Sequence, residues 1–404
     1  MKKLLGIALG IITSIGGFLD VGAIATSAEA GAAFGYRLVW ALALGTLCVI
    51  VLVEMSGRLA AVSKHTLVDA VREHFGVRFH ALLLAAELAI DYLVLAAEIG
   101  GVCLALQLVT GVGFRWWALP VAFAVWLLLW RGTFGLIENG VTLLGLVTVV
   151  FVAAAVKLQP GWRGLAAGLL PTLPGQDRGH YLFIAVSILG ALISPYLFYF
   201  YSSGAREEKW DEGHLGSNRA IAVLGMGFGS VISLGVLIVA ARVLQPNGIQ
   251  VDRYEQVALT LAQPFGRWGF FLFAASLGIA CFGAALEVGL DVGYVTAQSF
   301  GWNWGESLRP RQDARFSLAY TVFVFLAALV MLAGVDPLQL TLFSMALTAV
   351  ILPLTIVPFL VLMNDARYLG EHRNGPLGNA VVIFTIGLAF LLALVAIPLE
   401  LIAG

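Results

Sequence analysis

GGFLDVGAIATSAEAGAAFGY, residues 16–36, places a carboxylate inside an apolar run that begins near residue 4. Asp20 is preceded by Gly16 and Gly17 and followed by Gly22, so glycine surrounds the charge. A charge near the centre of a bilayer costs about 2.5–3.5 kcal/mol, and backbone that leaves the helix there needs other hydrogen-bond partners. The segment therefore predicts a membrane helix that is broken at Asp20, and it indicates that the Asp20 carboxylate has a functional role.

The composition of the whole chain is that of a polytopic membrane protein. Of its 404 residues 60% are hydrophobic and only 12% are charged, and the mean hydropathy is +0.94. Soluble domains carry about 25% charged residues. Apolar stretches recur from end to end, so we expect a single transmembrane domain over residues 1–404, embedded in a lipid bilayer. The net charge of −1 and the scattered arginines exclude nucleic acid as a partner.

The hydropathy pattern predicts an all-α bundle of about eleven membrane spans. The predicted spans are residues 4–31, 38–62, 81–109, 117–130, 137–156, 181–203, 221–243, 268–300, 316–333, 338–363 and 377–402. Between the seventh and eighth spans, VDRYEQVALTLAQPFGRWG has the spacing of an amphipathic helix. If the N-terminus is cytoplasmic, 15 of the 23 Lys and Arg residues fall inside. We therefore expect the N-terminus in the cytoplasm and the C-terminus outside, in a bacterial inner membrane.

A second interrupted span lies five spans after the first. GALISPYLFYFYSSGAR, residues 190–206, carries Ser194 and Pro195, and the backbone groups that Pro195 leaves unpaired fall within the membrane. Interrupted helices at corresponding places in two five-helix halves are typical of inverted-repeat transporters with substrate at the midplane. The expected fold is LeuT-like, with broken helices 1 and 6, repeats over about residues 1–157 and 180–364, and an extra helix over 376–402.

Each break also has a purely structural explanation. A proline commonly bends a helix, and glycine-rich spans commonly form packing seams. The two breaks together, with a carboxylate at one of them, favour a transport site instead. Unwound carbonyl groups and Asp20 would there coordinate a cation.

DVGAIATSAEAGAAFGYRLVW, residues 20–40, resembles the first helix of the NRAMP (natural resistance-associated macrophage protein) family of divalent-metal transporters. The family pattern is D-P-G-N followed by A-T and then A-G-x-x-F-G-Y-x-L-x-W. Looser matches are SPYLFYFYSS against M-P-H-N-x-x-x-H-S, AEIGG in the third span, and ILPLTIVPFLVLMNDARYLGE near the end. The resemblance covers most of the chain. It implies a transporter whose substrate is a divalent metal and which needs no cofactor.

The resemblance implies a metal site that has lost most of its side-chain ligands. Asp20 matches the family's metal-binding aspartate, but Ala23 stands at its ligand asparagine. In the sixth span Ala191 matches the residue whose carbonyl binds metal, and Ser194 replaces the ligand methionine. Met345 replaces a glutamine of the tenth span. The chain therefore resembles a divergent NRAMP-related branch, similar to magnesium transporters.

The proton pathway that the resemblance implies is altered as well. Tyr196 stands where the family has a histidine implicated in proton movement, and Leu95 replaces an aspartate of the third span. Glu98 keeps the family's glutamate and is a candidate gate or relay residue. We therefore expect proton coupling to be weak or absent.

The loss of the methionine ligand has a chemical consequence. A thioether is soft and favours Mn²⁺, Fe²⁺ or Cd²⁺, so the hydroxyl of Ser194 removes a filter against Mg²⁺ and Ca²⁺. Mg²⁺ usually keeps several waters, and the small Ala23 and Ser194 leave room for them beside Asp20. We expect the selectivity to shift toward hard ions of the Mg²⁺ or Mn²⁺ class.

Other acidic residues fall inside predicted spans. Glu287 and Asp291 lie one turn apart on the eighth span, where they would form a second cation site, a proton path, or a structural pairing with an arginine or backbone donors. Glu87 and Asp91 on the third span lie nearer a membrane face, and we expect them to be interfacial. Glu54 and Arg58 have the spacing of an intrahelical ion pair.

The remaining residues give no sign of an enzyme. The sequence contains no P-loop, no H-E-x-x-H and no G-x-S-x-G motif. Cys48, Cys103 and Cys281 are far apart and lie in predicted spans, as small core residues do. The sequence does not determine the oligomeric state, and a monomer is compatible with the expected fold.

The sequence therefore predicts a secondary transporter that moves a divalent metal cation by alternating access around Asp20. The main alternative keeps the fold and changes the substrate to an amino acid or other small organic solute, since half-helix N-termini also suit a carboxylate. A membrane-embedded sensor or scaffold is a third reading. Asp20 argues against an anionic substrate travelling alone, and the lack of a soluble output domain argues against the sensor.

Overall fold

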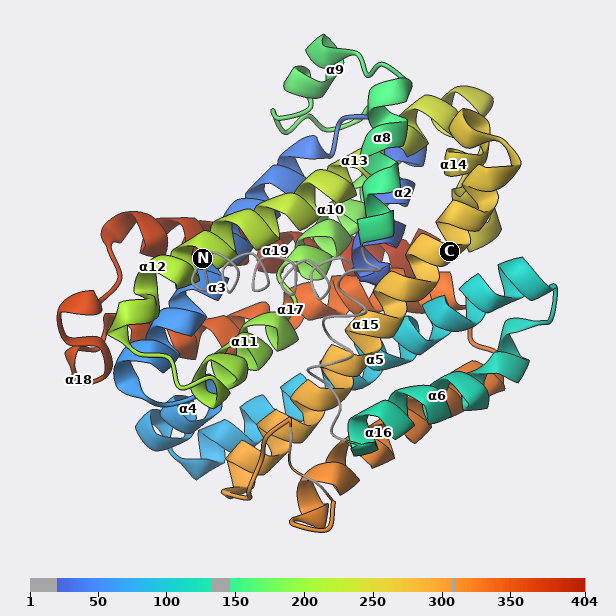
Figure 1. Cartoon of the computed structure of the whole chain (residues 1–404). Coiled ribbons are helices and arrows are strands. Elements are labelled where there is room, and N and C mark those ends of the chain that lie inside the picture. Colours follow the sequence, from blue (N-terminus) through green and yellow to red (C-terminus); the bar gives the residue numbers. More distant parts are fainter. Residues whose placement is uncertain (1–19, 132–145, 307, 309, 404) are drawn as a thin grey trace.

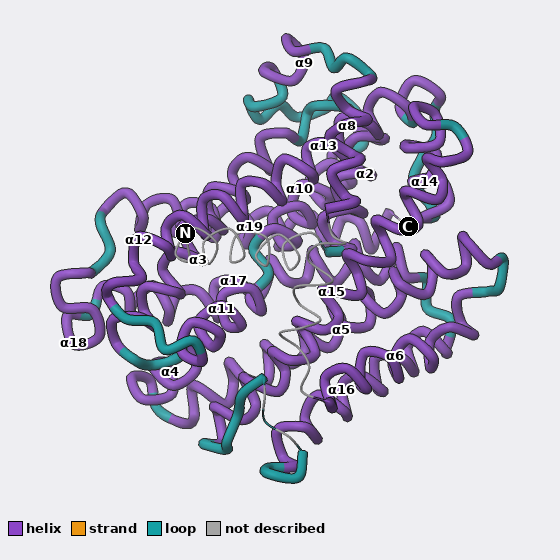
Figure 2. Tube along the Cα trace, viewed as in Figure 1, coloured by secondary structure: helices purple, strands orange, loops and turns teal. Residues whose placement is uncertain are grey.

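The computed structural model describes residues 20–131, 146–306, 308 and 310–403, and these residues form helices joined by short loops, with no strand among them (Figure 2). Glycines 16 and 17, the first part of predicted span one and the first part of predicted span five lie outside the described residues. The all-α architecture predicted from hydropathy is confirmed.

The helices cross and pack against one another in one bundle (Figure 1). The first half contains α2(Val21–Phe34), α3(Val39–Ser63), α4(Leu67–Phe75), α5(Val77–Thr110), α6(Phe114–Arg131), η1(Leu146–Val149), α8(Val150–Lys157) and α9(Trp162–Ala167). The second contains α10(Arg178–Leu192), α11(Pro195–Glu207), η2(Glu212–His214), α12(Leu215–Ile221), the π-helical η3(Ala222–Met226), α13(Gly227–Val243), η4(Gln245–Asn247), α14(Tyr254–Phe265), α15(Arg267–Phe300), α16(Ala314–Ala333) and α17(Pro337–Asn364). The chain continues through α18(Ala366–Leu369) and η5(Gly370–His372) into α19(Pro376–Ala403).

Eight helical segments of the described chain are long and apolar enough to cross a membrane. They match the predicted spans two, three and six to eleven. They are Val39–Ser63, Val77–Thr110, Arg178–Glu207, Glu212–Asn247, Arg267–Phe300, Ala314–Ala333, Pro337–Asn364 and Pro376–Pro398. The helices α2, α6 and α8 coincide with described parts of predicted spans one, four and five. The count of eleven spans therefore stays a prediction.

The outer helices present apolar side chains to the surroundings, as a bilayer requires. Along α16 the side chains of Leu318, Val322, Leu326 and Leu329 are 42–60% exposed, and their spacing places them on one stripe. Figure 1 shows α6 beside α16 at the edge of the bundle, and these two helices pack together. An exposed apolar stripe of this kind is typical of membrane-spanning helices.

Two sequence predictions, an amphipathic helix and an intrahelical ion pair, are confirmed by the structure. The segment before the eighth span forms α14, whose buried residues Tyr254, Val257, Ala258 and Leu261 follow the amphipathic spacing. Glu54 and Arg58 form the expected ion pair, with Nη2 3.0 Å from Oε2.

The first described helix is held by close backbone packing. Gly31 of α2 faces α13, where a Cβ at this position would collide with the Leu237 carbonyl oxygen and lie 2.8 Å from the Ala240 Cβ. Glycine is therefore required here by space, and its position fixes how α2 lies against α13.

The Gly31→Ala variant should be destabilised by about 1–3 kcal/mol, because the added methyl group forces α2 and α13 apart. Its melting temperature in detergent should fall below that of the wild type. Gly227→Ala is the matched control, since no atom lies within 4 Å of a Cβ there. Equal melting temperatures for the two variants would contradict the packing assignment.

Candidate transport site

The helix α2 begins at Asp20, within the bundle. The Asp20 side chain caps the helix, and its Oδ1 accepts a hydrogen bond from the Ala23 amide at 2.7 Å. The Asp20 backbone is extended, with φ −100° and ψ 178°, so Asp20 is not part of the helix that it caps. Asp20 is only 1% exposed. The structure therefore places a buried carboxylate at the positive end of a helix, where a negative charge is stabilised.

A second carboxylate reaches the same helix end from α5. The Val21 amide donates to Glu98, at 3.1 Å from Oε1 and 3.3 Å from Oε2. Glu98 is fully buried. The first N–H groups of α2 are thus shared between its own Asp20 and Glu98. The sequence suggested a role for Glu98 as a gate or relay but did not indicate this contact with the start of α2.

The second break separates α10 from α11. The former ends at Leu192, and Ser194 precedes the latter with an extended ψ of 127° and Pro195 at the first helical position. In an unbroken helix the Ala191 carbonyl would accept from the amide of residue 195, but proline has no N–H. The Ala191 carbonyl is therefore released from the helical ladder. Ala191 and Ser194 are 2% and 0% exposed, so both lie inside the bundle.

Met345 of α17 contacts both the start of α2 and the end of α10. A Cβ built at Gly22, two residues after Asp20, would lie 2.7 Å from both Sδ and Cε of Met345. The backbone carbonyl of Met345 lies against Gly190, one residue before Ala191. One residue thus brings its thioether to the start of α2 and its backbone to the end of α10.

Two further predicted residues lie around this site. Tyr196, in the first turn of α11, is 1% exposed and within electrostatic range of Asp20, Glu98 and Glu287. Glu98 is likewise within range of Asp20 and Glu287. The structure therefore places Glu98 of α5, Tyr196 of α11 and Glu287 of α15 in the region of Asp20.

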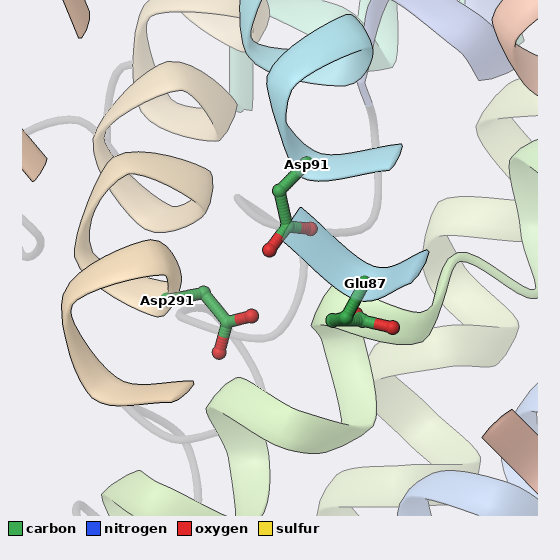
Figure 3. Close-up of side chains that lie close together, drawn as sticks. All are labelled: Glu87, Asp91 and Asp291. Carbon is green, nitrogen blue, oxygen red and sulfur yellow. The ribbon is translucent and has the colours of Figure 1, made fainter. Parts of the chain in front are cut away.

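The acidic residues farther along α5 and α15 are arranged differently from the expectation. Glu87 and Asp91 are 1% and 0% exposed, so the prediction that they are interfacial is wrong. They lie inside the bundle because α5 packs along α15, which brings Asp291 to them. One carboxylate oxygen of each residue lies within 4.8 Å of the others (Figure 3). Asp291 is thus grouped with Glu87 and Asp91 and not with Glu287, its neighbour on the same helix.

The loops outside the bundle carry ordinary helix caps. Asp313 precedes α16 and Asp365 precedes α18, and each caps its helix while pairing with the arginine two residues later. Hydrogen bonds from Arg315 lower the pKa of Asp313 to about 2, and those from Arg367 lower that of Asp365 to about 2. These carboxylates belong to the ends of the helices and not to the site.

The chemistry of the gathered groups suits a divalent cation. The Asp20 carboxylate, the freed Ala191 carbonyl and the Ser194 hydroxyl are groups of the type that bind a cation through oxygen, and the Met345 sulfur adds a soft group. Ala23 contributes its backbone N–H to Asp20 and no side-chain ligand.

The architecture is that of a LeuT-fold membrane transporter. The structure superposes on MhsT in complex with L-phenylalanine with a TM-score of 0.66 at 14% identity, covering 96% of this chain and 97% of that one. It superposes on the Eremococcus coleocola manganese transporter, in complex with an aromatic bis-isothiourea substituted compound, with a TM-score of 0.77 at 23% identity. The superposition covers 97% of this chain and 85% of that one.

Sequence comparison gives the family. The model of the natural resistance-associated macrophage protein-like (Nramp) family matches residues 10–398, so the chain belongs to that family. The divalent metal cation transporter MntH of Klebsiella pneumoniae subsp. pneumoniae is 28% identical over 378 residues, which are 89% of this chain and 85% of the relative. The protein is therefore an integral membrane transporter of the divalent-metal class and not an enzyme, and the metal is its substrate and not a cofactor. The amino-acid alternative is not favoured by this membership.

Proposed function

We propose that the protein moves divalent cations of the Mn²⁺ and Mg²⁺ class across the membrane by alternating access around Asp20. The observation that carries the proposal is that Met345 contacts both the start of α2, which the buried Asp20 carboxylate caps, and the end of α10, where the Ala191 carbonyl is released. The names of the relatives support the cation class, since one is a manganese transporter and another a divalent metal cation transporter.

Alternating access requires two halves that move against each other. We assign these halves to inverted repeats over residues 1–157 and 180–364, with the N-terminus in the cytoplasm. Asp20 belongs to the first half, whereas Ala191, Ser194 and Met345 belong to the second. A cation held between them would be exposed to one side of the membrane or the other as the halves rock.

Uptake into proteoliposomes tests the proposal. Purified full-length protein should carry Mn²⁺ and Mg²⁺ in a saturable manner, and each should compete with the other. An L-amino acid should neither enter nor slow the metal. Uptake of the amino acid without metal flux, or absence of all metal flux in well-folded protein, would overturn the proposal.

The Met345 sulfur makes a specific contribution to selectivity. It is a soft group that contacts Gly22 at the start of α2, so Met345→Leu should weaken Cd²⁺ and Mn²⁺ binding while leaving Mg²⁺ binding nearly unchanged. Calorimetric titration of the two proteins with each ion measures the change. A Cd²⁺ to Mg²⁺ affinity ratio equal to that of the wild type would show that the thioether does not face the ion.

Proton coupling should be weak or absent. A phenol has an unperturbed pKa near 10 and leucine does not titrate, so Tyr196 and Leu95 do not exchange protons near neutral pH. Glu98 is occupied by the Val21 amide, which favours a fixed role at the helix break. Metal flux should therefore follow the membrane potential.

A pH dye inside the proteoliposomes checks this expectation. Metal uptake should proceed without a matching acidification of the lumen and should increase when the interior is made negative. Stoichiometric acidification that is lost in Glu98→Gln or Asp291→Asn would instead establish a coupled symporter.

A further inference from the structure

We propose that Glu87, Asp91 and Asp291 form a second divalent-cation site, distinct from the site at Asp20. The proposal goes beyond the transport function, because it concerns three residues to which that function gives no role. Glu87 and Asp91 lie one turn apart on α5, and Asp291 faces them from α15 (Figure 3).

The three carboxylates have no hydrogen-bond partner within the part of the chain that the structure describes. All six carboxylate oxygens of the three residues are buried without a hydrogen bond to the part of the protein that the structure describes. Two residues are fully buried and Glu87 is 1% exposed. Three ionised carboxylates in such a place repel one another and are not solvated, so a positive charge among them would relieve a large penalty.

A second observation comes from a different helix. Tyr199 of α11 is 1% exposed, and its hydroxyl has no hydrogen-bond partner among the described residues. This phenol is within electrostatic range of all three carboxylates. A hydroxyl that is buried beside the cluster without a protein partner is placed to hydrogen-bond a ligand or a water carried by that ligand.

The distances between the carboxylate oxygens indicate which cations the cluster would hold. One oxygen of each carboxylate lies within 4.8 Å of the others. Two ligands on opposite sides of Mn²⁺ or Mg²⁺ are separated by about 4–4.5 Å, and those of Ca²⁺ by about 5 Å. Oxygen ligands without nitrogen or sulfur favour hard ions. The cluster therefore fits Mn²⁺, Mg²⁺ or Ca²⁺ and lacks the soft group that Met345 brings to the first site.

The position of the cluster connects it to the transport site. Residues 87, 91 and 98 follow one stripe of α5, so Asp91 lies about 10 Å along the helix from Glu98. Tyr196, which is in range of Asp20, is also in range of Asp91 and is one turn from Tyr199. A cation at the cluster would thus sit beside the first site and influence its occupancy through charge repulsion.

Counting bound ions tests the proposal with a readout other than flux. Equilibrium dialysis of full-length protein in detergent against Mn²⁺ should give two ions per chain. The double variant Asp91→Asn with Asp291→Asn should bind one, and so should Asp20→Asn. Glu255→Gln is the control, because its carboxylate accepts from Gln107 outside the cluster, and it should bind two.

The two proposed sites fail in distinguishable ways. If the wild type binds one ion and Asp20→Asn binds none, the cluster holds no metal and the second site is overturned while the first stands. If the wild type binds one ion that only the double variant loses, the cluster is confirmed and the assignment of Asp20 is overturned. Glu87→Gln provides a second variant should the double variant fail to fold, and it should also lower the count.

Discussion

Replacing Asp20 by Ala should abolish divalent-cation flux while the protein stays folded. In the proposed site Asp20 is the charged ligand at the start of α2. Without it the ion meets neutral groups from Ala191, Ser194 and Met345, and the nearby Glu98 carboxylate is already held by the Val21 amide. The substitution also removes a buried charge, so it should not unfold the bundle. The Mn²⁺ uptake rate into proteoliposomes, normalised to folded protein, should fall to the level of empty vesicles.

A cap variant outside the site separates loss of the ligand from loss of a helix cap. Asp336 caps α17 in the same manner, accepting from the amides of Leu338 at 2.9 Å and Gln339 at 3.0 Å. Asp336→Ala should cost about 1 kcal/mol of stability and retain flux. Wild-type flux in Asp20→Ala, or equal loss in both variants, would contradict the role of Asp20 as the ion ligand.

The second large effect is on selectivity. Installing Asn at Ala23 together with Met at Ser194 should raise the preference for Mn²⁺ and Cd²⁺ over Mg²⁺, by adding an amide oxygen and a soft sulfur to the site. A tenfold change in the affinity ratio, about 1.4 kcal/mol, is the expected scale. Competition binding of the ions to purified protein measures the ratio.

The larger volume of the new side chains needs its own control, because Ala23 and Ser194 are both buried. The matched variant carries Asn at Ala23 and Leu at Ser194, which fills a similar volume without sulfur. It should lower the affinity for all ions without the gain for Cd²⁺. If the methionine and leucine variants give the same Cd²⁺ to Mg²⁺ ratio, Ser194 does not line the site.

The special place of Asp20, a buried carboxylate at the start of α2, could be predicted from the sequence because its signal is local. A carboxylate between glycines within an apolar span has a high free-energy cost, and the cost is visible without knowledge of the fold. The break at Pro195 is local for the same reason, since a proline removes a hydrogen bond wherever it lies in a helix.

The contacts between helices could not be predicted in this way. The bond from Val21 to Glu98 joins residues 77 positions apart, and no periodicity encodes it. The error on Glu87 and Asp91 has the same origin. Their depth in the bundle depends on the packing of α5 against α15, whereas the sequence indicated only their distance from the end of a span.

Met345 shows how a substitution can be seen in the sequence and its effect missed. The sequence placed methionine where the related family has glutamine, and the selectivity argument considered only the sulfur lost at Ser194. The structure returns a thioether to the start of α2 from a different helix. The proposed site therefore offers a soft sulfur ligand as well as hard oxygen ligands.

The most direct test of the central claim is the anomalous scattering of Mn²⁺ in crystals of the full-length protein. The account predicts a peak between the Asp20 carboxylate and the Ala191 carbonyl, at about 2.0–2.6 Å from a ligand oxygen or one water layer beyond it. A peak among Glu87, Asp91 and Asp291 alone, with none beside Asp20, would contradict it.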